Sequence, residues 1–488
     1  MAITEDNPIF QDSPNTRMLL TAAILLLVTV TYFNSFPGAF HYDDFGLFLE
    51  NPEIRQQARH PASLLTLYGG RPLSLLSLDL NLLLCGEDPF WFHLVNVLLH
   101  LAVTSLLFFL VAGWSSSIYT GFLTALIFGL HPLQAQAVNY IWARSVLLMA
   151  LFLFLSILVS EKSKKTWPGL LFFQLAVWSR MDALAALPIM ILMNRRKKGP
   201  VLILGSINLA AAGYSMFSAD NADMAWNHSS PAQYILEAPL NLLRYIKFMF
   251  NPGEHSIFHA YPESGIIKIA ASFCLVAIIV FILVKNRKTQ PLLFTGPAWL
   301  ILMLLPSLLI PNADPVNESR AYYAFAGIAL LTAVVLTIAG RSAGEKLSAF
   351  VTGSRKRLIA GLVTVLVSAA CVPILALKTT ERNFVWKDDL RIWREAVSMN
   401  PENHLPVYNL GIALIRNGEF EEGCGALARA IKLNPLDDMS YSAAGYCFEV
   451  MGETEKAKAY YSRAMEINPE NKTALESLES LGDTGIKQ

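Results

Sequence analysis

Long apolar runs dominate the first three quarters of the chain and are separated by short polar or basic segments. A helix that crosses a bilayer needs about 20 consecutive, mostly apolar residues. The pattern predicts about eleven membrane spans, at 18–36, 91–113, 117–131, 141–160, 167–180, 182–193, 200–217, 265–284, 291–311, 321–340 and 358–377. Three of them are short, and the pair around Arg180 fits two half-spans. The pattern therefore indicates an all-α, polytopic membrane protein.

Basic residues between the spans set the orientation of the chain. Four short connections carry clusters of lysine and arginine, at 162–165, 195–198, 285–288 and 355–357. Such loops stay cytoplasmic under the positive-inside rule. With eleven spans and a cytoplasmic N-terminal segment, residues 1–17, all four clusters face the cytoplasm. The loop 37–90 and everything after residue 378 are then expected on the outer face.

The last quarter of the chain has a different pattern, an internal repeat. Asn-Pro recurs at 400–401, 434–435 and 468–469, which is a period of 34 residues. This is the length of a tetratricopeptide helix–turn–helix unit. In phase with it, Gly411 and Gly445 fall where the first helix needs a small residue. The sequence therefore predicts two domains: a membrane domain, residues 18–378, and a tetratricopeptide α-solenoid, residues 379–488. The solenoid is expected to bind a protein or peptide, with a structural cap as the alternative.

Composition changes the picture in two ways. With 54% hydrophobic and 16% charged residues, the chain needs membrane lipid as its solvent. Lysine plus arginine equals aspartate plus glutamate at 38 each, so no basic excess indicates a nucleic-acid partner. The five cysteines lack a C-x-x-C spacing, which argues against a zinc site or a redox dithiol. Cys424 and Cys447 fall on neighbouring repeat helices, where an oxidising compartment would allow them to pair.

Two adjacent carboxylates, Asp43 and Asp44, come directly after the first span, in the sequence His41-Tyr42-Asp43-Asp44-Phe45. A carboxylate at the edge of an apolar site can act as a base or bind a divalent cation. The alternative is a pair of solvated turn residues. Asp43 and Asp44 are therefore the candidate catalytic residues, and Mg²⁺ or Mn²⁺ is a candidate cofactor, although no metal cluster with diagnostic spacing is present.

Four arginines fall on the same outer face as this pair. An ionisable group at membrane depth costs about 2.5–3.5 kcal/mol on insertion scales, so it tends to mark a cavity or a function. A guanidinium binds phosphate through two parallel hydrogen bonds. Snorkelling to the interface is the alternative for any single one. The candidate phosphate-binding residues are Arg71, Arg144, Arg180 and Arg320.

Further polar residues on this face are candidates for lining a pocket. His131 precedes Pro132, which breaks the third span and frees backbone groups beside the expected cavity. Asp79, in the apolar stretch 73–84, is either a packed residue or a partner that neutralises Arg71. The remaining pocket candidates are Asp182, Glu318 and Tyr323.

Five stretches together resemble the transmembrane and tetratricopeptide O-mannosyltransferases and their bacterial relatives. They are Phe40–Asp44, Arg71–Leu73, Phe90–His100, His131–Val138 and the C-terminal repeats. The resemblance implies a GT-C fold and a glycosyltransferase that uses a polyprenyl- or dolichyl-phosphate sugar. It also implies a bacterial inner (plasma) membrane protein whose active site and repeats lie on the extracytoplasmic side.

The resemblance also implies roles for these residues. One aspartate of the Asp43–Asp44 pair would take the proton of an acceptor hydroxyl, and the arginines would hold the lipid phosphate. The chain departs from its relatives at Gln136, where they often carry an acid, and at Arg180-Met181, where they carry a Lys-Glu pair. The acceptor is expected to be a protein presented by the repeats. A lipid or glycan acceptor, or a non-catalytic membrane scaffold, are the alternatives.

Overall fold

The computed structural model describes residues 10–60, 71–194, 198–218, 230–251, 253, 255–259, 264–311, 315–348 and 353–482. Every regular element in these ranges is a helix, which confirms the all-α prediction. The chain forms two compact units. The first comprises Met1–His255 and Glu263–Lys387, and the second comprises Ser256–Pro262 and Asp388–Gln488.

The helices of the first unit follow the apolar runs of the sequence. They are α1 (Pro14–Tyr32), α2 (Pro52–Ala58), α4 (Pro72–Cys85), α5 (Pro89–Ser115), α6 (Ile118–Gly129), α7 (Gln134–Asn139), α8 (Arg144–Lys162), α9 (Trp167–Ser179), α10 (Leu187–Met193), α11 (Lys198–Ser218), α12 (Pro231–Leu236), α13 (Ala238–Phe250), α14 (Ile266–Asn286), α15 (Pro291–Leu309), α16 (Glu318–Ala321), α17 (Phe325–Leu347), α18 (Gly353–Ala369) and α19 (Cys371–Val385). Four short helices accompany them: η1 (Phe33–Ser35), η2 (Phe45–Leu49), η4 (Ile141–Ala143) and η5 (Met181–Ala186).

Seven helical segments of the described chain are long and apolar enough to cross a membrane. They are Pro14–Ser35, Pro89–Ser115, Ile141–Lys162, Ile266–Asn286, Pro291–Leu309, Phe325–Leu347 and Gly361–Val385, and each overlaps an expected span. Shorter apolar helices occupy Ile118–Gly129 and Met181–Met193, where two more spans are expected. The helices α9 and α11 occupy the two remaining expected spans, 167–180 and 200–217. The expected total of about eleven is therefore not confirmed.

Helix ends in this unit follow from local chemistry. Ser13 caps α1, and Asp88 caps α5 by accepting a hydrogen bond from the backbone N–H of Phe90; a proline opens each helix. The helix α6 ends at Gly129, two residues before His131, and α7 begins at Gln134, two residues after Pro132. The predicted break therefore produces a buried corner between α6 and α8.

Burial differs strongly between the spans. The helix α8 packs against α5 and α9, and 78% of the most apolar part of its span is buried. The helix α14 contacts α13 and α15, and only 11% of the corresponding part is buried. At the crossing of α15 and α17, a side chain on Gly296 or Gly327 would collide with the backbone of the other helix. Small residues here allow the two backbones to touch.

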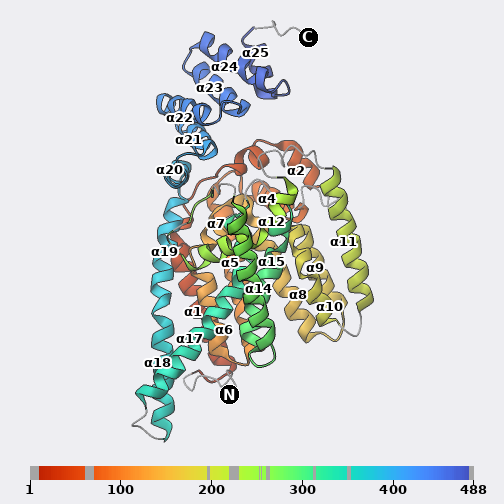
Figure 1. Cartoon of the computed structure of the whole chain (residues 1–488), viewed down its shortest axis with the longest axis vertical. Coiled ribbons are helices and arrows are strands. Elements are labelled where there is room, and N and C mark those ends of the chain that lie inside the picture. The colour runs from red at the N-terminus through yellow and green to blue at the C-terminus, as the bar shows by residue number, and fades with distance from the viewer. Residues whose placement is uncertain are drawn as a thin grey trace. The chain divides into compact units, whose positions relative to one another are not determined.

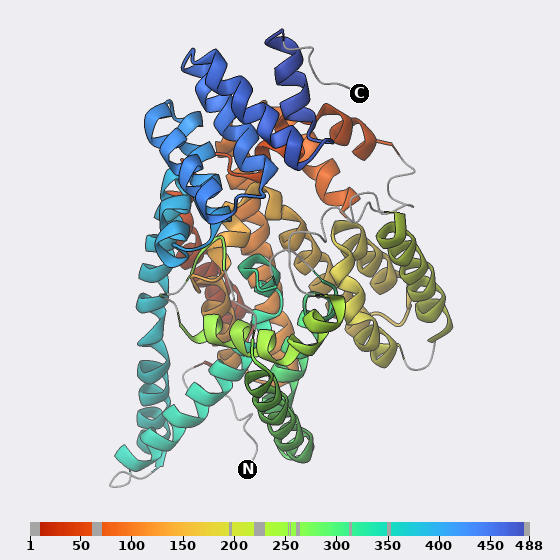
Figure 2. The same ribbon diagram turned by 45° about the horizontal axis from the view of Figure 1, so that its top comes forward.

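The second unit contains consecutive helix hairpins (Figures 1 and 2). Its helices are α20 (Asp389–Met399), α21 (His404–Arg416), α22 (Phe420–Leu433), α23 (Asp438–Val450), α24 (Thr454–Ile467) and α25 (Lys472–Ser480). A Cβ atom on Gly411 would lie 2.7 Å from Leu427 Cγ, and one on Gly445 would lie 2.7 Å from Tyr461 Cδ1. The requirement for small residues, predicted from the 34-residue period, is thereby explained.

A disulfide joins two successive repeats of this unit. Cys424 on α22 pairs with Cys447 on α23, with a Cα–Cα distance of 5.9 Å. Both residues belong to the apolar cluster between these helices. The other three cysteines, Cys85, Cys274 and Cys371, carry free thiols.

Candidate active site

The Asp43–Asp44 pair lies in a tight turn between η1 and η2. The backbone N–H of Asp44 donates to the carbonyl of His41 at 2.8 Å, and that of Phe45 donates to Tyr42 at 3.2 Å. Tyr42 has a φ of 44°, which is the left-handed region that a tyrosine rarely adopts. The turn therefore holds the two carboxylates in one particular arrangement, at a cost in backbone strain.

Asp44 is fully buried and is anchored by two backbone amides. Its Oδ2 accepts a hydrogen bond from the N–H of His41 at 2.9 Å, and its Oδ1 accepts one from the N–H of Trp142 at 2.7 Å. Burial raises the pKa of Asp44 to about 7, although the hydrogen bonds from His41 and Trp142 lower it. Asp44 thus fastens the turn to the α7–α8 corner.

Asp43 is only partly buried and lies beside Tyr140. Its backbone N–H donates to the Tyr140 hydroxyl at 3.3 Å. Burial and then the charge of Asp43 raise the pKa of Tyr140 well above its usual value, so the phenol stays protonated. Of the two carboxylates, Asp43 is the more accessible one.

Arg71, at the start of α4, interacts electrostatically with Asp43. Its guanidinium stacks over the ring of Trp142, 4.6 Å from the centroid. Burial and the nearby Arg180 lower the pKa of Arg71 to about 10, and Asp43 opposes this shift. Arg71 therefore remains charged at neutral pH. Its environment places Asp43, Arg71 and Arg180 in one electrostatic group.

Arg180 extends this group towards α16 and α17. It forms an ion pair with Asp182, and both side chains are about one-fifth exposed. The Tyr323 hydroxyl donates to Asp182 Oδ2 at 3.2 Å, and Arg320 interacts electrostatically with Asp182. Six of the predicted residues therefore lie in one cluster, in which Tyr323 is buried and the other five are partly exposed. We call it the charged cluster: Asp43, Arg71, Arg180, Asp182, Arg320 and Tyr323.

Arg144 has a different environment. It is fully buried, and its guanidinium donates to Asn96 Oδ1 at 2.8 Å, Asn81 Oδ1 at 2.9 Å and the carbonyls of Phe92 and Ser77 at 3.1 and 3.2 Å. These partners come from α4 and α5, so Arg144 ties α8 to both helices. Its predicted contact with phosphate stays a prediction.

The expected pairing of Asp79 with Arg71 is wrong. Asp79, which is buried, forms an ion pair with Arg59, whose Nη2 donates to Asp79 Oδ1 at 2.7 Å. Sequence spacing alone does not reveal this pairing, because α2 returns along α4. The groups that act electrostatically on Arg71 are instead Arg180, Asp43, Tyr140 and Asp182.

His131 and Glu318 belong to a second, buried group. His255 Nδ1 lies 3.3 Å from Glu318 Oε2, and the rings of His131 and His255 meet edge to face at 6.2 Å. The ring of His131 also packs on Phe325 at 4.3 Å. The helix α16 carries both Glu318 of this group and Arg320 of the charged cluster.

Sequence reasoning missed the residues that hold the carboxylates. Tyr140 and Trp142 contact the turn across nearly 100 residues of sequence. A hydroxyl and a backbone amide give no sequence signal for such contacts. The sequence shows that His41 is next to the pair, but it does not show that the backbone N–H of His41 donates a hydrogen bond to Asp44.

Within the described residues, no group of three or more histidine, cysteine, aspartate or glutamate side chains is placed to hold a metal ion. The candidate Mg²⁺ or Mn²⁺ stays a prediction.

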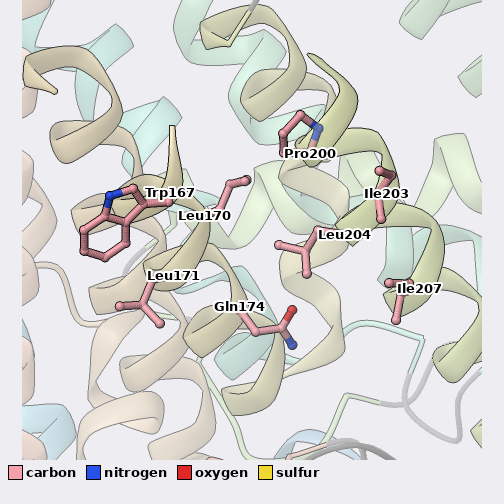
Figure 3. A pocket seen from close by; sticks show the side chains of 8 residues that line it. All are labelled: Trp167, Leu170, Leu171, Gln174, Pro200, Ile203, Leu204 and Ile207. Atoms are coloured by element: carbon pink, nitrogen blue, oxygen red, sulfur yellow. The ribbon is translucent and has the colours of Figure 1, made fainter. Parts of the chain in front are cut away.

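An apolar groove of about 510 Å³ lies between α9 and α11 (Figure 3). Trp167, Leu171 and Ile203 are among its lining residues. Gln174 and Asn208 exchange amide hydrogen bonds across it at 3.1 and 2.8 Å, which holds the two helices together. The groove contains none of the predicted site residues.

Comparison with known proteins shows which proteins are similar to this chain in sequence. A tetratricopeptide-repeat family model matches residues 440–471, which fall on α23 and α24. The similar curated proteins are named protein O-mannosyl-transferases. The resemblance to the transmembrane and tetratricopeptide O-mannosyltransferases is thereby confirmed.

Three particular relatives show how far the similarity extends. Human TMTC1 is 32% identical over 149 residues, which covers 27% of this chain and 17% of that protein. Xenopus laevis tmtc2 is 36% identical over 160 residues, 30% of this chain and 19% of the relative. F38B6.6 of Caenorhabditis elegans is 22% identical over 459 residues, 84% of this chain and 62% of the relative. The chain thus spans less than a fifth of the first two relatives. No solved structure is a significant match.

Proposed function

We propose that this protein is a membrane glycosyltransferase that moves a sugar from a polyprenyl-phosphate donor to a hydroxyl group of a protein. One observation carries the proposal: the accessible carboxylate Asp43 lies in the same cluster as Arg71, Arg180 and Arg320. The O-mannosyl-transferase names of the relatives support the same reaction and a protein acceptor. The solenoid is suited to presenting that acceptor.

The reaction follows from the chemistry of this cluster. Asp43 accepts the proton of the acceptor hydroxyl while the oxygen attacks the anomeric carbon. The bond between that carbon and the phosphate oxygen breaks, and the lipid phosphate leaves with the electron pair. Arg71, Arg180 and Arg320 stabilise the negative charge that develops on the leaving phosphate. Asp44 stays out of the reaction and fixes the turn.

Two observations support an extracytoplasmic site. Disulfides persist in oxidising compartments and are rare in the cytosol, and the second unit contains one. By the positive-inside rule, the basic connections of the first unit lie on the cytoplasmic side, and the predicted topology puts the Asp43–Asp44 pair on the opposite side. We therefore propose that the charged cluster and the repeats lie on the outer face of a plasma membrane.

The proposal is tested with purified full-length protein in nanodiscs and a panel of polyprenyl-phosphate sugars. Asp43→Asn removes the base, so transfer and release of the donor sugar should fall at least about 100-fold. Asp44→Asn should reduce the rate less, because it weakens an anchor. Asp12→Asn, which alters an exposed ion pair with Arg17, is the matched control and should keep wild-type activity.

The outcomes separate the alternatives. Folded wild-type protein that turns over no donor would favour the membrane scaffold. Turnover with transfer only to lipid or glycan acceptors would replace the protein acceptor and keep the chemistry. An active Asp43→Asn variant would remove Asp43 from its role as the base.

A further inference from the structure

The helix α19 ends beside the turn that carries the two carboxylates. Its last residues are fixed by side-chain hydrogen bonds to the ends of α1 and α7. Asn383 accepts from Asn139 Nδ2 at 2.8 Å and donates to the carbonyl of Thr31 at 3.0 Å. One turn earlier, the Thr379 hydroxyl donates to the carbonyl of Leu130 at 2.7 Å. The position of Trp386, which caps α19, is therefore well defined.

His41 connects this helix end to Asp44. Its Nε2 lies 2.8 Å from the carbonyl oxygen of Trp386. Since a carbonyl oxygen only accepts hydrogen bonds, Nε2 carries the proton. The backbone N–H of the same residue donates to Asp44 Oδ2. His41 is completely buried, so both bonds are shielded from competing water.

The ring of Trp386 also reaches the residue that holds Asp43. It meets the ring of His41 edge to face at 5.7 Å and lies 5.8 Å from the ring of Tyr140. The Tyr140 hydroxyl accepts the backbone N–H of Asp43. Trp386 thus contacts the partners of both carboxylates, and it is only 1% exposed.

We infer that His41 is a positioning residue, which together with Trp386 sets the placement of the Asp43–Asp44 turn from the end of α19. This rests on the proposed function for its catalytic consequence. The chain leaves the first unit at Lys387 and enters the repeat unit at Asp388. The connection to the repeats therefore begins two residues beyond the carbonyl that binds His41.

The kinetic test compares His41→Leu with His41→Gln in full-length protein, using the polyprenyl-phosphate sugar on which the wild type acts. Leucine cannot donate a hydrogen bond to the Trp386 carbonyl. A displacement of the catalytic base by about 1 Å can lower the rate up to 100-fold. We expect kcat to fall about 10- to 100-fold in His41→Leu, with the donor KM within about twofold. Glutamine offers an amide N–H at similar reach, so His41→Gln should recover most of kcat.

His100→Leu is the matched control. His100 is also a buried histidine; its Nε2 lies 3.0 Å from the carbonyl of Gly129 and its Nδ1 lies 2.8 Å from the Tyr322 hydroxyl, and neither partner belongs to the charged cluster. It should show a comparable loss of thermal stability but a kcat within about twofold of the wild type. Equal kcat values for His41→Leu and wild type, or equal losses in both leucine variants, would overturn the inference.

Hydrogen–deuterium exchange tests the positioning without relying on transfer. Peptides covering residues 38–49 should exchange at least about tenfold faster in His41→Leu and in Trp386→Ala than in the wild type. They should not do so in His100→Leu. Unchanged exchange in this peptide would overturn the inference even if no donor is turned over, whereas an inactive wild type with the expected exchange would contradict only the proposed function.

Discussion

A carboxylate that accepts two backbone hydrogen bonds away from water is held in one orientation, whereas a partly exposed neighbour can meet a substrate. Asp44 and Asp43 differ in this way although they are adjacent in sequence. The sequence predicts the pair because it follows a span and lies on the same face as four arginines. It does not predict which member is anchored, because the anchor comes from Trp142, 98 residues away.

Asp44 predicts a pH dependence of stability. Its pKa is raised to about 7 in the folded protein, compared with about 3.9 in an unfolded chain. The folded state therefore holds the proton more tightly, and stability falls as pH rises between about 4 and 7. The difference between these two pKa values sets an upper bound of roughly 4 kcal/mol on the loss of folding free energy. Thermal unfolding of the wild type and Asp44→Asn at pH 5 and pH 8 measures this.

We expect the melting temperature to fall further between pH 5 and pH 8 in the wild type than in Asp44→Asn. Asparagine does not titrate, so the variant lacks this contribution. Identical pH profiles for the two proteins would show that Asp44 does not change its protonation on unfolding.

At the scale of elements, the long apolar runs were predictable because lipid demands an uninterrupted stretch of apolar residues. The repeat helices were predictable from their 34-residue period. The short elements were not: α4 lies inside the expected outer loop 37–90, and α7 turns a corner that a proline only indicates. Arg144 shows the limit for single residues, because its burial depends on two asparagines from other helices.

Arg144 should be needed mainly for stability. Arg144→Met leaves the Asn81 and Asn96 side-chain oxygens and the Phe92 carbonyl without their donor in a buried site. Each such loss costs about 1–3 kcal/mol, so the variant should unfold at a clearly lower temperature. Arg391→Met, which removes an exposed ion pair with Asp388, is the control and should change little.

A stable Arg144→Met protein with a strongly raised donor KM would instead identify Arg144 as a phosphate ligand. Differential scanning fluorimetry and donor titration on the same preparation distinguish the two roles.

At the scale of the whole molecule, the disulfide predicts on which side of the membrane the repeats lie, because disulfides persist mainly in oxidising compartments. In intact cells, a thiol reagent that does not cross the plasma membrane should leave Cys424 and Cys447 unlabelled until an external reductant is added. Mass spectrometry of the non-reduced protein should find their peptides joined.

Reduction should lower the unfolding temperature of the repeat unit by roughly 10 °C, because a closed loop of this size contributes a few kcal/mol. Cys424→Ser should show the same loss without reductant, and Cys371→Ser should not. Free thiols at 424 and 447 in the native membrane would place the repeats in the cytosol.

The contrast between α8 and α14 has a consequence for how the sequence can change over time. Most of the apolar part of the α8 span is buried by other helices. Almost all of the apolar part of the α14 span is unburied. A position that faces lipid accepts nearly any apolar side chain, while a packed position accepts few. The helix α14 should therefore drift freely among leucine, isoleucine, valine and phenylalanine in diverging lineages, and α8 should preserve both size and shape.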